Sequence, residues 1–541
     1  MVQSSDKMKS IEMCIEKVSR FRRILPQFIA TTVKNLLLTD LGLITTFPSI
    51  LIPALTGISN EHNRNEFITI TPSEASWLGS ICYLLQPFGS LLSILITDSL
   101  GRKRSMIIVN LPLAIGWFMV YQGDVFWKII SGYALLGLGV GMMEAPLITY
   151  LGEICEPSTR GVLIAYSGIS VTLGIFMVFG LNTLMAWRSV ALVCLAMPVI
   201  TAVAVCFIPE TPQWLLSKNR KSEAEKSLCW LRGWVSSDVI ANEFYELQKH
   251  SERSKSCDLC IKENLKCVHP LPTMREKLSE MKRKRTLKPF SIIISLFVIV
   301  QFTGIASMAP FMVRIFKAYE SPIPPDQAAA IMSFLNNLAT VIFIISVRFS
   351  GKRRFFLTML TGIFLCSAIL ACYGFIYLPT GYISFDQNIE SLQPDNGNIH
   401  YIPLVCLILW SCFSYCGFLT MPWMLLSEIF PFRSRGIASG FAAAFCYILG
   451  FISRKTYYNL EFTLSLPGST LFYCAVSGLG FIVMYLILPE TENISLEDIE
   501  LHYSDNSKKI TDHKIVKSSQ KMVAKDVENS FKKTEMECTK L

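Results

Sequence analysis

Two glutamate–arginine pairs stand at the ends of long apolar runs and repeat one spacing. "YLGEICEPSTRG" places Glu153 seven residues before Arg160, and "MPWMLLSEIFPFRSRG" places Glu428 seven residues before Arg435. A carboxylate and a guanidinium form a charge-assisted pair. At a membrane edge such pairs are partly desolvated, so losing one partner costs more than it does at an exposed surface. The pairs therefore predict ion-pair networks that can hold one face of the molecule closed.

Two further charged signatures recur in the same order as these pairs. "SLGRKR" precedes the first pair and "FSGKRR" the second, while "PETPQWLL" and "PETENISL" follow them. Three signatures repeated in one order indicate an internal duplication of the chain. The alternative interpretation is that the charges only mark helix ends, which explains the arginines but not the glutamates.

Composition identifies the elements that must position these residues. The chain has 541 residues, of which 51% are hydrophobic and 17% charged, and the charges lie between apolar blocks. Blocks of about 20 apolar residues predict membrane-spanning helices. We expect an all-α polytopic membrane protein with twelve spans, near 29–55, 75–96, 106–122, 126–150, 162–184, 188–208, 289–314, 328–347, 355–377, 401–425, 437–456 and 469–488.

The net charge of +9 does not indicate a nucleic-acid partner, because lysine and arginine gather in alternate connections between the spans. Such a bias marks the cytoplasmic loops of membrane proteins. It predicts that both termini and the long polar segment are cytoplasmic. The expected organisation is a cytoplasmic N-terminal segment, a six-helix half, a cytoplasmic linker with short helices, a second six-helix half and a cytoplasmic tail, at 1–28, 29–208, 209–288, 289–488 and 489–541.

These signatures resemble the sugar porter family of the major facilitator superfamily, and are most similar to insect facilitated trehalose transporter-like proteins. "SWLGS", "GRKR", "YLGEICEPSTRG", "PETPQWLL", "MPW" and "PETENISLEDIE" carry the resemblance over roughly residues 25–500. It implies two six-helix halves that work by alternating access. It also implies a gating network made of Arg102, Lys103, Glu153, Arg160, Glu210, Lys352, Arg353, Glu428, Arg435 and Glu490.

A solute site is expected near the middle of the membrane, on helices interrupted by glycine or proline. Sugar hydroxyls need amide or hydroxyl partners, and sugar C–H faces need an aromatic ring. The candidates are Gln301, Thr303, Asn336 and Trp423, and the resemblance singles out Gln301, Asn336 and Trp423. Asn337 is expected to point away on the same helix. The alternative for Gln301 and Asn336 is hydrogen bonding between helices without a ligand.

Several positions depart from the family pattern. Val300 and Ala306 replace an amide each, Gly168 stands where many hexose carriers have glutamine, and Cys446 with Tyr447 replaces an Asn-Trp pair. These changes put a glucose-type pocket in doubt while the transport machinery is kept.

Asp40 and Glu144 fall inside predicted spans, where ionisable groups are usually functional. Proton coupling is one interpretation of these carboxyl groups. The other is local pairing, with Lys34 or with another helix. Phe47 stands at the position that is acidic in the family's proton symporters, which favours uncoupled transport.

A cysteine cluster in the linker offers Cys257, Cys260, Cys267 and His269. Three thiolates and an imidazole suit tetrahedral zinc, but a single compact cluster in a cysteine-rich chain favours a reduced loop. We therefore predict no metal and no cofactor.

The sequence as a whole predicts a facilitative carrier of a sugar or polyol, such as a hexose or a trehalose-like disaccharide, in the plasma membrane. The alternatives are a solute sensor on the same fold and a proton-coupled sugar symporter. An enzyme is not expected, because no nucleophile–base or metal-ligand set lies at membrane depth. The expected partners are a small sugar and the lipid bilayer.

Overall fold

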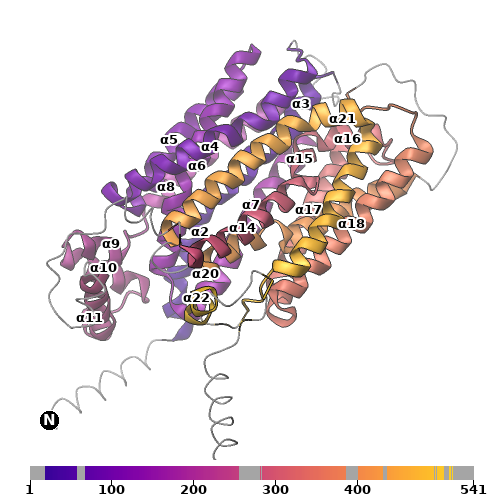
Figure 1. Ribbon diagram of the computed structural model, residues 1–541. Coiled ribbons are helices and arrows are strands. Elements are labelled where there is room, and N and C mark those ends of the chain that lie inside the picture. Colours follow the sequence, from indigo (N-terminus) through magenta and orange to yellow (C-terminus); the bar gives the residue numbers. More distant parts are fainter. Residues whose placement is uncertain are drawn as a thin grey trace, which may run out of the picture.

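The computed structural model describes residues 19–57, 68–254, 283–385, 400–430, 435–492 and 496–504, together with 281, 494, 511–512 and 515. Within these ranges the regular elements are all helices (Figure 1). The cysteine cluster expected to be metal-free, Cys257, Cys260, Cys267 and His269, lies outside the described residues.

The N-terminal half contains six spans. The first is α2 (Arg20–Thr46) followed directly by α3 (Pro48–Leu55), and Pro48 at the junction starts the second segment without needing an N–H partner. It begins nine residues before the predicted start at 29. The other five are α4 (Pro72–Leu100), α5 (Arg102–Tyr121), α6 (Phe126–Ile154), α7 (Pro157–Asn182) and α8 (Trp187–Cys206).

The C-terminal half opens with a broken span. Helix α14 (Lys284–Phe302) ends just before Gly304, whose φ of 103° favours glycine. The span continues at a bend of 49° with α15 (Ile305–Met308), η2 (Ala309–Phe311) and α16 (Met312–Ala318). Next come α17 (Pro325–Ser350) and α18 (Lys352–Tyr377). The tenth span is broken too, into α19 (Tyr401–Phe413), the π-helical segment η4 (Ser414–Phe418) and α20 (Met421–Ile429).

The last two spans lie within α21 (Arg435–Ile487), which has 53 residues. A helix of that length would be about 80 Å long, far more than the roughly 30 Å hydrocarbon core requires. The backbone reverses at Ser465, whose φ of 68° is not helical, just before Pro467. The two yellow-orange arms of α21 in Figure 1 are therefore separate spans.

Among the described residues, ten helices are long and apolar enough to cross a membrane, and the bent pair around Gly304 makes an eleventh. Counting α21 as two spans gives twelve, so the predicted twelve-helix architecture is confirmed. The predicted eleventh span ended at 456, whereas the structure continues that helix to the break at Ser465.

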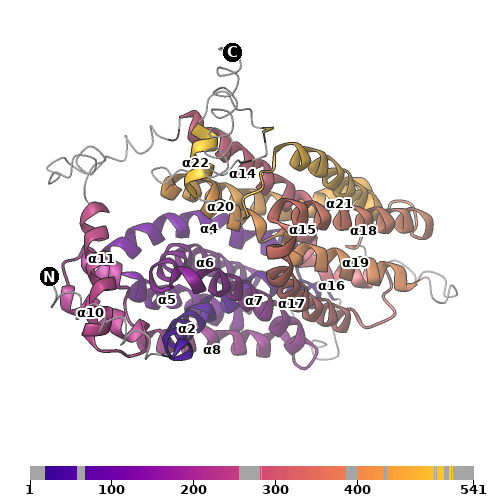
Figure 2. The same cartoon turned by 90° about the horizontal axis from the view of Figure 1, so that it is seen from below.

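The two halves lie side by side, purple against orange in Figure 2. Contacts between them run mainly along two helix pairs, α4 with α21 and α7 with α17. Within the N-terminal half, glycines bring helices close together: a Cβ on Gly89 or Gly141 would lie within 3 Å of the facing backbone of α6 or α4. The N-terminal half is thus a tightly packed body, which meets the other half along these two helix pairs.

One end of the bundle carries the short helices, and we call it the linker face. It holds α9 (Pro212–Ser217), α10 (Lys221–Leu231) and α11 (Ser237–Ser254), and also α22 (Leu496–Ser504) (Figure 1). Helices α9–α11 belong to the N-terminal half, because Arg22 Nε donates to the Gly233 carbonyl at 3.0 Å and Arg232 Nη1 to the Ile154 carbonyl at 3.2 Å. Helix α22 packs on α14 and α20 of the other half.

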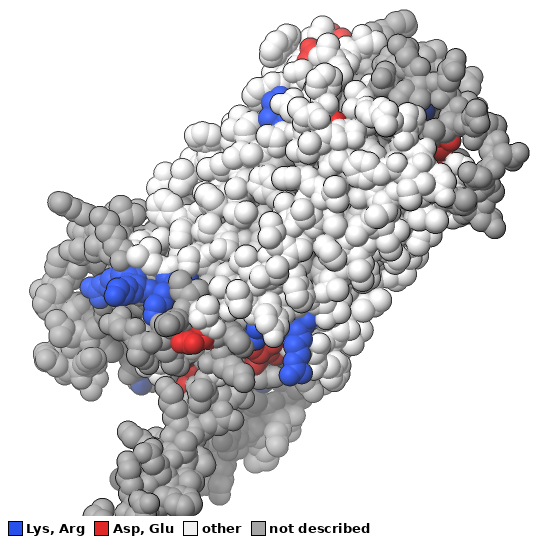
Figure 3. Space-filling view, turned by 45° about the vertical axis from the view of Figure 1, so that its right-hand side comes forward, with Lys and Arg blue, Asp and Glu red and all other residues white. Residues whose placement is uncertain are grey.

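The outer surface fits a bilayer. Figure 3 shows a broad uncharged belt, with lysine, arginine and acidic residues gathered towards its two ends. Large apolar side chains such as Leu95, Leu111, Ile345 and Leu479 are exposed on it. An exposed apolar surface of this extent indicates contact with lipid.

Candidate solute site and linker-face networks

An ion-pair network closes the linker end of the N-terminal half. Arg102, the first residue of α5, donates from Nη2 and Nε to Glu153 Oε1 at 2.7 and 3.2 Å. Both side chains are 13% exposed. Glu210 accepts from the backbone N–H groups of Arg102 and Lys103 at 3.1–3.2 Å. A carboxylate at this place satisfies N–H groups that have no partner within the helix and complements the helix dipole.

Gly101 makes this approach possible. Its φ is 97°, and a Cβ built there would lie 2.3 Å from Glu210 Oε2. Burial raises the pKa of the Glu210 carboxyl above its ordinary value, while the N–H groups of Thr211, Lys103 and Arg102 oppose the rise. The carboxylate is thus held by the backbone at the entrance of α5.

The C-terminal half repeats the arrangement with different residues. Lys352 Nζ contacts both oxygens of Glu428 at 2.7 and 2.8 Å and Glu492 at 3.2 Å. Glu490 accepts from the backbone N–H groups of Lys352 and Arg353, each at 3.1 Å. Gly351 has a φ of 79°, and a Cβ there would lie 2.7 Å from Glu490 Oε2. The duplication read from the sequence is therefore also a duplication of contacts.

The sequence predicted ion-pair networks that can hold one face of the molecule closed. Every ion pair that the structure describes among these residues lies within one half, so in this conformation none of them joins the two halves. The side chains of Arg160 and Arg435 lie outside the described part of the chain. Lys103 Nζ donates to the Cys206 carbonyl at 2.8 Å and Arg353 Nη2 to that of Tyr485 at 2.5 Å, again within a half.

Glu156, four residues before Arg160 in the same motif, was missed by the sequence reasoning. Its carboxylate accepts from Arg23 Nε at 2.7 Å and lies 3.4 Å from Arg232 Nε, so it joins α2, the start of α7 and the end of α10. The available signal was its place inside "GEICEPSTRG", but the ion-pair prediction used only Glu153 of that motif.

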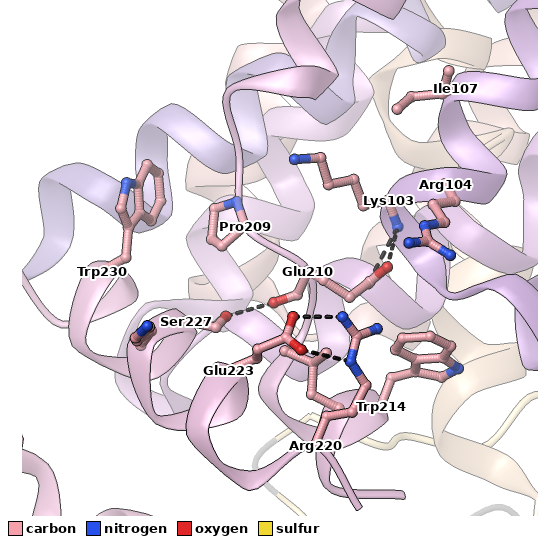
Figure 4. Close-up of a pocket in the computed structure, with 12 residues that line it drawn as sticks. Lys103, Arg104, Ile107, Pro209, Glu210, Trp214, Arg220, Glu223, Ser227 and Trp230 are labelled. Atoms are coloured by element: carbon pink, nitrogen blue, oxygen red, sulfur yellow. Dashed lines mark hydrogen bonds and ion pairs between the residues drawn. The ribbon is translucent and has the colours of Figure 1, made fainter. Parts of the chain in front are cut away.

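A pocket of about 510 Å³ opens beside Glu210 on the linker face (Figure 4). Lys103 and Arg104 line it from α5, and Trp214, Lys226 and Trp230 line it from the linker helices. Ser227 donates to the Glu210 carbonyl, and Arg220 pairs with Glu223 across the pocket rim. The pocket therefore lies where the linker helices meet the membrane helices, away from the predicted solute residues.

Gln301, the first predicted solute residue, lies at the interface between the halves. Its Nε2 is 3.4 Å from Cys446 Sγ, and its Oε1 is 3.4 Å from Arg454 Nη1. Trp423 lies nearby, edge-on to Phe297 and 6.0 Å from the ring of Tyr447. These two predicted residues thus border one region, formed with α21.

Thr303 and Asn336 face elsewhere in this conformation. Thr303 donates to the Val300 carbonyl at the break of the seventh span and is fully buried. Asn336 Nδ2 donates to Ser411 Oγ at 2.9 Å inside the C-terminal half, and its buried Oδ1 has no partner in the described part of the chain. An unsatisfied buried acceptor costs free energy, so Asn336 keeps the capacity to accept from a solute hydroxyl.

Asn337 does not point away from the interface, contrary to expectation. Its Nδ2 donates to the Thr172 carbonyl at 3.1 Å, and its Oδ1 accepts from Thr172 Oγ1 at 2.9 Å. Thr172 belongs to α7, so this asparagine joins the two halves. The 100° rotation between neighbouring residues thus directs Asn336 to Ser411 within the C-terminal half and Asn337 to Thr172 of the other half.

The two predicted intramembrane carboxyl groups, Asp40 and Glu144, each have one buried oxygen without a hydrogen-bond partner among the described residues. Asp40 Oδ1 accepts from Trp117 Nε1 at 3.0 Å, whereas Lys34 donates to Ser167 Oγ at 2.9 Å, so the proposed Lys34 partner is replaced by a neighbouring helix. Glu144 hydrogen-bonds with Ser90 and, across the interface, with Tyr447.

The end of the bundle opposite the linker face is closed between the halves. Ser49 Oγ donates to the Ala309 carbonyl at 2.5 Å, and Asn182 Nδ2 donates to Asp326 Oδ1 at 2.7 Å. Arg314 Nη1 donates to Thr56 Oγ1 at 2.6 Å. These contacts and the separate linker-face networks describe a conformation shut at one end.

Comparison with known proteins agrees with this architecture. A family model described as "Sugar (and other) transporter" matches residues 40–503. The facilitated trehalose transporter Tret1 of Apis mellifera ligustica is 28% identical over 453 residues, or 84% of each chain. The Tret1 of Drosophila virilis is 28% identical over 477 residues, which are 88% of this chain and 49% of the relative, so this chain spans about half the length of that protein.

Solved structures share the fold. The proton:xylose symporter XylE bound to 6-bromo-6-deoxy-D-glucose matches with a TM-score of 0.65 at 17% identity, over 89% of this chain and all of that one. The inward-open xylose transporter XylE from E. coli matches with a TM-score of 0.66 at 17% identity, over 88% of this chain and 99% of that one.

Proposed function

The chain belongs to the family of sugar (and other) transporters, and we propose that it carries a sugar or sugar-like polyol across the plasma membrane by facilitated diffusion. The linker face, with both ends of the described chain, is the cytoplasmic face in this proposal. The loops there carry most of the basic residues, as the positive-inside rule expects. The Tret1 relatives support a facilitative carrier, with a trehalose-like disaccharide or a hexose as solute.

The observation that carries the proposal is the doubled network at the linker face. Arg102 with Glu153 and Lys352 with Glu428 stand at equivalent helix ends in two six-helix halves. Each half is braced separately, while contacts between the halves hold the opposite end closed. Two rigid halves with breakable contacts at one end can rock about a central site, which is the mechanical requirement for alternating access.

The test is uptake of labelled trehalose, glucose and other sugars into proteoliposomes containing the purified full chain. We expect saturable uptake that stops when the inside and outside concentrations are equal, and counterflow when the liposomes are preloaded with the same sugar. Liposomes without protein provide the background. Binding of a sugar without uptake would instead identify a solute sensor on this fold.

A further inference from the structure

Arg454 is a basic residue buried in the middle of the membrane that the proposed function does not yet use. Its side chain is 7% exposed. It lies eleven residues before the break at Ser465, so it is about 16 Å along the helix from that end. Half the thickness of the hydrocarbon core is about 15 Å. Arg454 thus lies at the depth expected for a solute site.

The contacts of Arg454 leave its charge without an acidic partner. Nη1 donates to the Gly450 carbonyl at 3.0 Å and contacts Gln301 Oε1 at 3.4 Å. The guanidinium carbon lies 3.7 Å from the ring centroid of Tyr83, in α4 of the other half. No carboxylate within the described chain lies within ion-pair distance of Arg454. The Nε–Nη2 edge also has no hydrogen-bond partner among the described residues.

Two other arginines have an acidic group beside them, unlike Arg454. Arg314, which is 2% exposed, is fixed at both ends of its guanidinium by Thr56 and the Ser384 carbonyl, and it interacts electrostatically with Glu461. Arg102 has Glu153. Burying a charge without a counter-charge is costly, so the open edge of Arg454 calls for an anionic partner from outside the chain.

The surroundings suit a polyhydroxylated molecule. Gln301 and Tyr83 contact Arg454 directly. These side chains come from both halves and offer amide and hydroxyl groups to solute hydroxyls. Val300 and Ala306, which replace amides of the family pattern, are buried and apolar.

We propose that the solute of this carrier is a sugar acid and that Arg454 binds its carboxylate. The inference rests on the proposed transport function and names the substrate class of its site. A guanidinium presents two parallel N–H groups to a carboxylate, and the free Nε–Nη2 edge is one such fork. Tyr83 covers the face of the guanidinium, and the described residues offer the Nε–Nη2 edge no hydrogen-bond partner. Gln301, already on the opposite nitrogen, remains available to the sugar hydroxyls.

The experiment compares an acid with its uncharged amide. Thermal stabilisation of the purified full chain in detergent is measured with D-glucuronate, D-galacturonate and D-gluconate, and with D-glucuronamide and D-glucose. At least one sugar acid is expected to bind tenfold or more tightly than the uncharged compounds. Arg454→Gln should weaken that binding by roughly ten- to a hundredfold, since hydrogen bonds to charged groups contribute that much. Binding of the amide should change less than about threefold.

Lys455→Gln is the matched control, because it removes a neighbouring positive charge that stacks on Trp77. It should leave acid binding unchanged. Arg454→Lys keeps the charge but not the fork, and should bind the acid with intermediate affinity, which also covers the case in which the glutamine variant does not fold.

Uptake separates this inference from the transport function. If proteoliposomes take up glucose or trehalose and no sugar acid binds more tightly than the amide, the inference is wrong and the proposed function stands. If a sugar acid binds through Arg454 but no solute enters the liposomes, the sugar-acid binding site at Arg454 stands and the transport function fails. Equal acid binding by Arg454→Gln and the unmodified protein would also overturn the inference.

Discussion

Glu210 and Glu490 occupy equivalent positions in the two halves, each accepting the backbone N–H groups that begin a membrane helix. The glycine before each helix allows the carboxylate to approach. Attraction between opposite charges does not explain this contact, because a glutamate side chain accepts hydrogen bonds from uncharged backbone N–H groups. The two halves therefore fix the start of a membrane helix in the same way, and the ion pairs between side chains form beside this contact.

Neutralising Glu153 or Glu428 should slow exchange. Glu153→Gln leaves Arg102 without its counter-charge, and Glu428→Gln does the same to Lys352. Losing one charge-assisted contact of about 1.5–3 kcal/mol should lower equilibrium exchange about tenfold while surface expression stays normal. The measurement is exchange of labelled solute in proteoliposomes. Unchanged exchange in both variants would reduce these residues to markers of helix ends.

Replacing Gly101 by alanine should lower the melting temperature through a specific clash. The new Cβ would lie 2.3 Å from Glu210 Oε2, in a backbone conformation with φ of 97°. Gly381→Ala is the control, because Gly381 also has positive φ (81°) but nothing within 4 Å of a Cβ. The left-handed conformation alone costs about 1–2 kcal/mol. Equal melting temperatures for the two variants would mean that the contact of Gly101 with the Glu210 carboxylate does not contribute to stability.

Transport should not be driven by a proton gradient. Asp40 is engaged by Trp117, and Glu144 by Ser90 and Tyr447. Phe47 is fully buried where a coupling acid would stand. In proteoliposomes with an acidic exterior, the internal solute concentration should level off at the external one. Accumulation above it, lost in Glu144→Gln, would show coupling through that carboxyl group.

Gln301 and Asn336 should contribute to solute affinity, whereas Asn337 should affect the rate. Gln301→Ala or Asn336→Ala removes one hydrogen-bonding amide, which contributes about 0.5–1.5 kcal/mol, so KM should rise about three- to tenfold. Asn337→Ala breaks contacts to Thr172 across the halves, and should change the maximal rate with little effect on KM. A larger KM effect for Asn337 than for the other two would place it in the site.

Locking the closed end should stop transport reversibly. Asn182 and Asp326 face each other across the halves with Nδ2 and Oδ1 2.7 Å apart. In Asn182→Cys/Asp326→Cys, an oxidant should join the halves and abolish uptake, and a reductant should restore it. The two single variants are the controls, and both should keep activity under oxidant. Full uptake in the cross-linked protein would show that this end need not open.

The sequence predicted the fold well because each span is long, apolar and bounded by charge. The repeated motifs also predicted equivalent positions in the two halves, among them Arg102 with Glu153 and Lys352 with Glu428, which pair in the structure. Arg454 was not predicted as a site residue, and the reason is physical. The stretch "ISRKTYYNLEF" has the polar composition typical of the end of a span, so the predicted helix stopped at 456. The structure carries that helix on to Ser465 and so places Arg454 at depth. Likewise the faces of Asn336 and Asn337 depend on helix rotation, which packing sets and spacing does not.

The short helices on the linker face are divided between the halves, so each half has an attachment site for a fluorescent dye outside its transmembrane helices. Helices α9–α11 are tied to the N-terminal half through Arg22 and Arg232, while α22 rests on the other half with Ile499 and Tyr503 buried. A donor dye on α11 and an acceptor on α22 would move with different rigid bodies. Their energy transfer would follow single cycles of rocking in real time, without a label on any transmembrane helix.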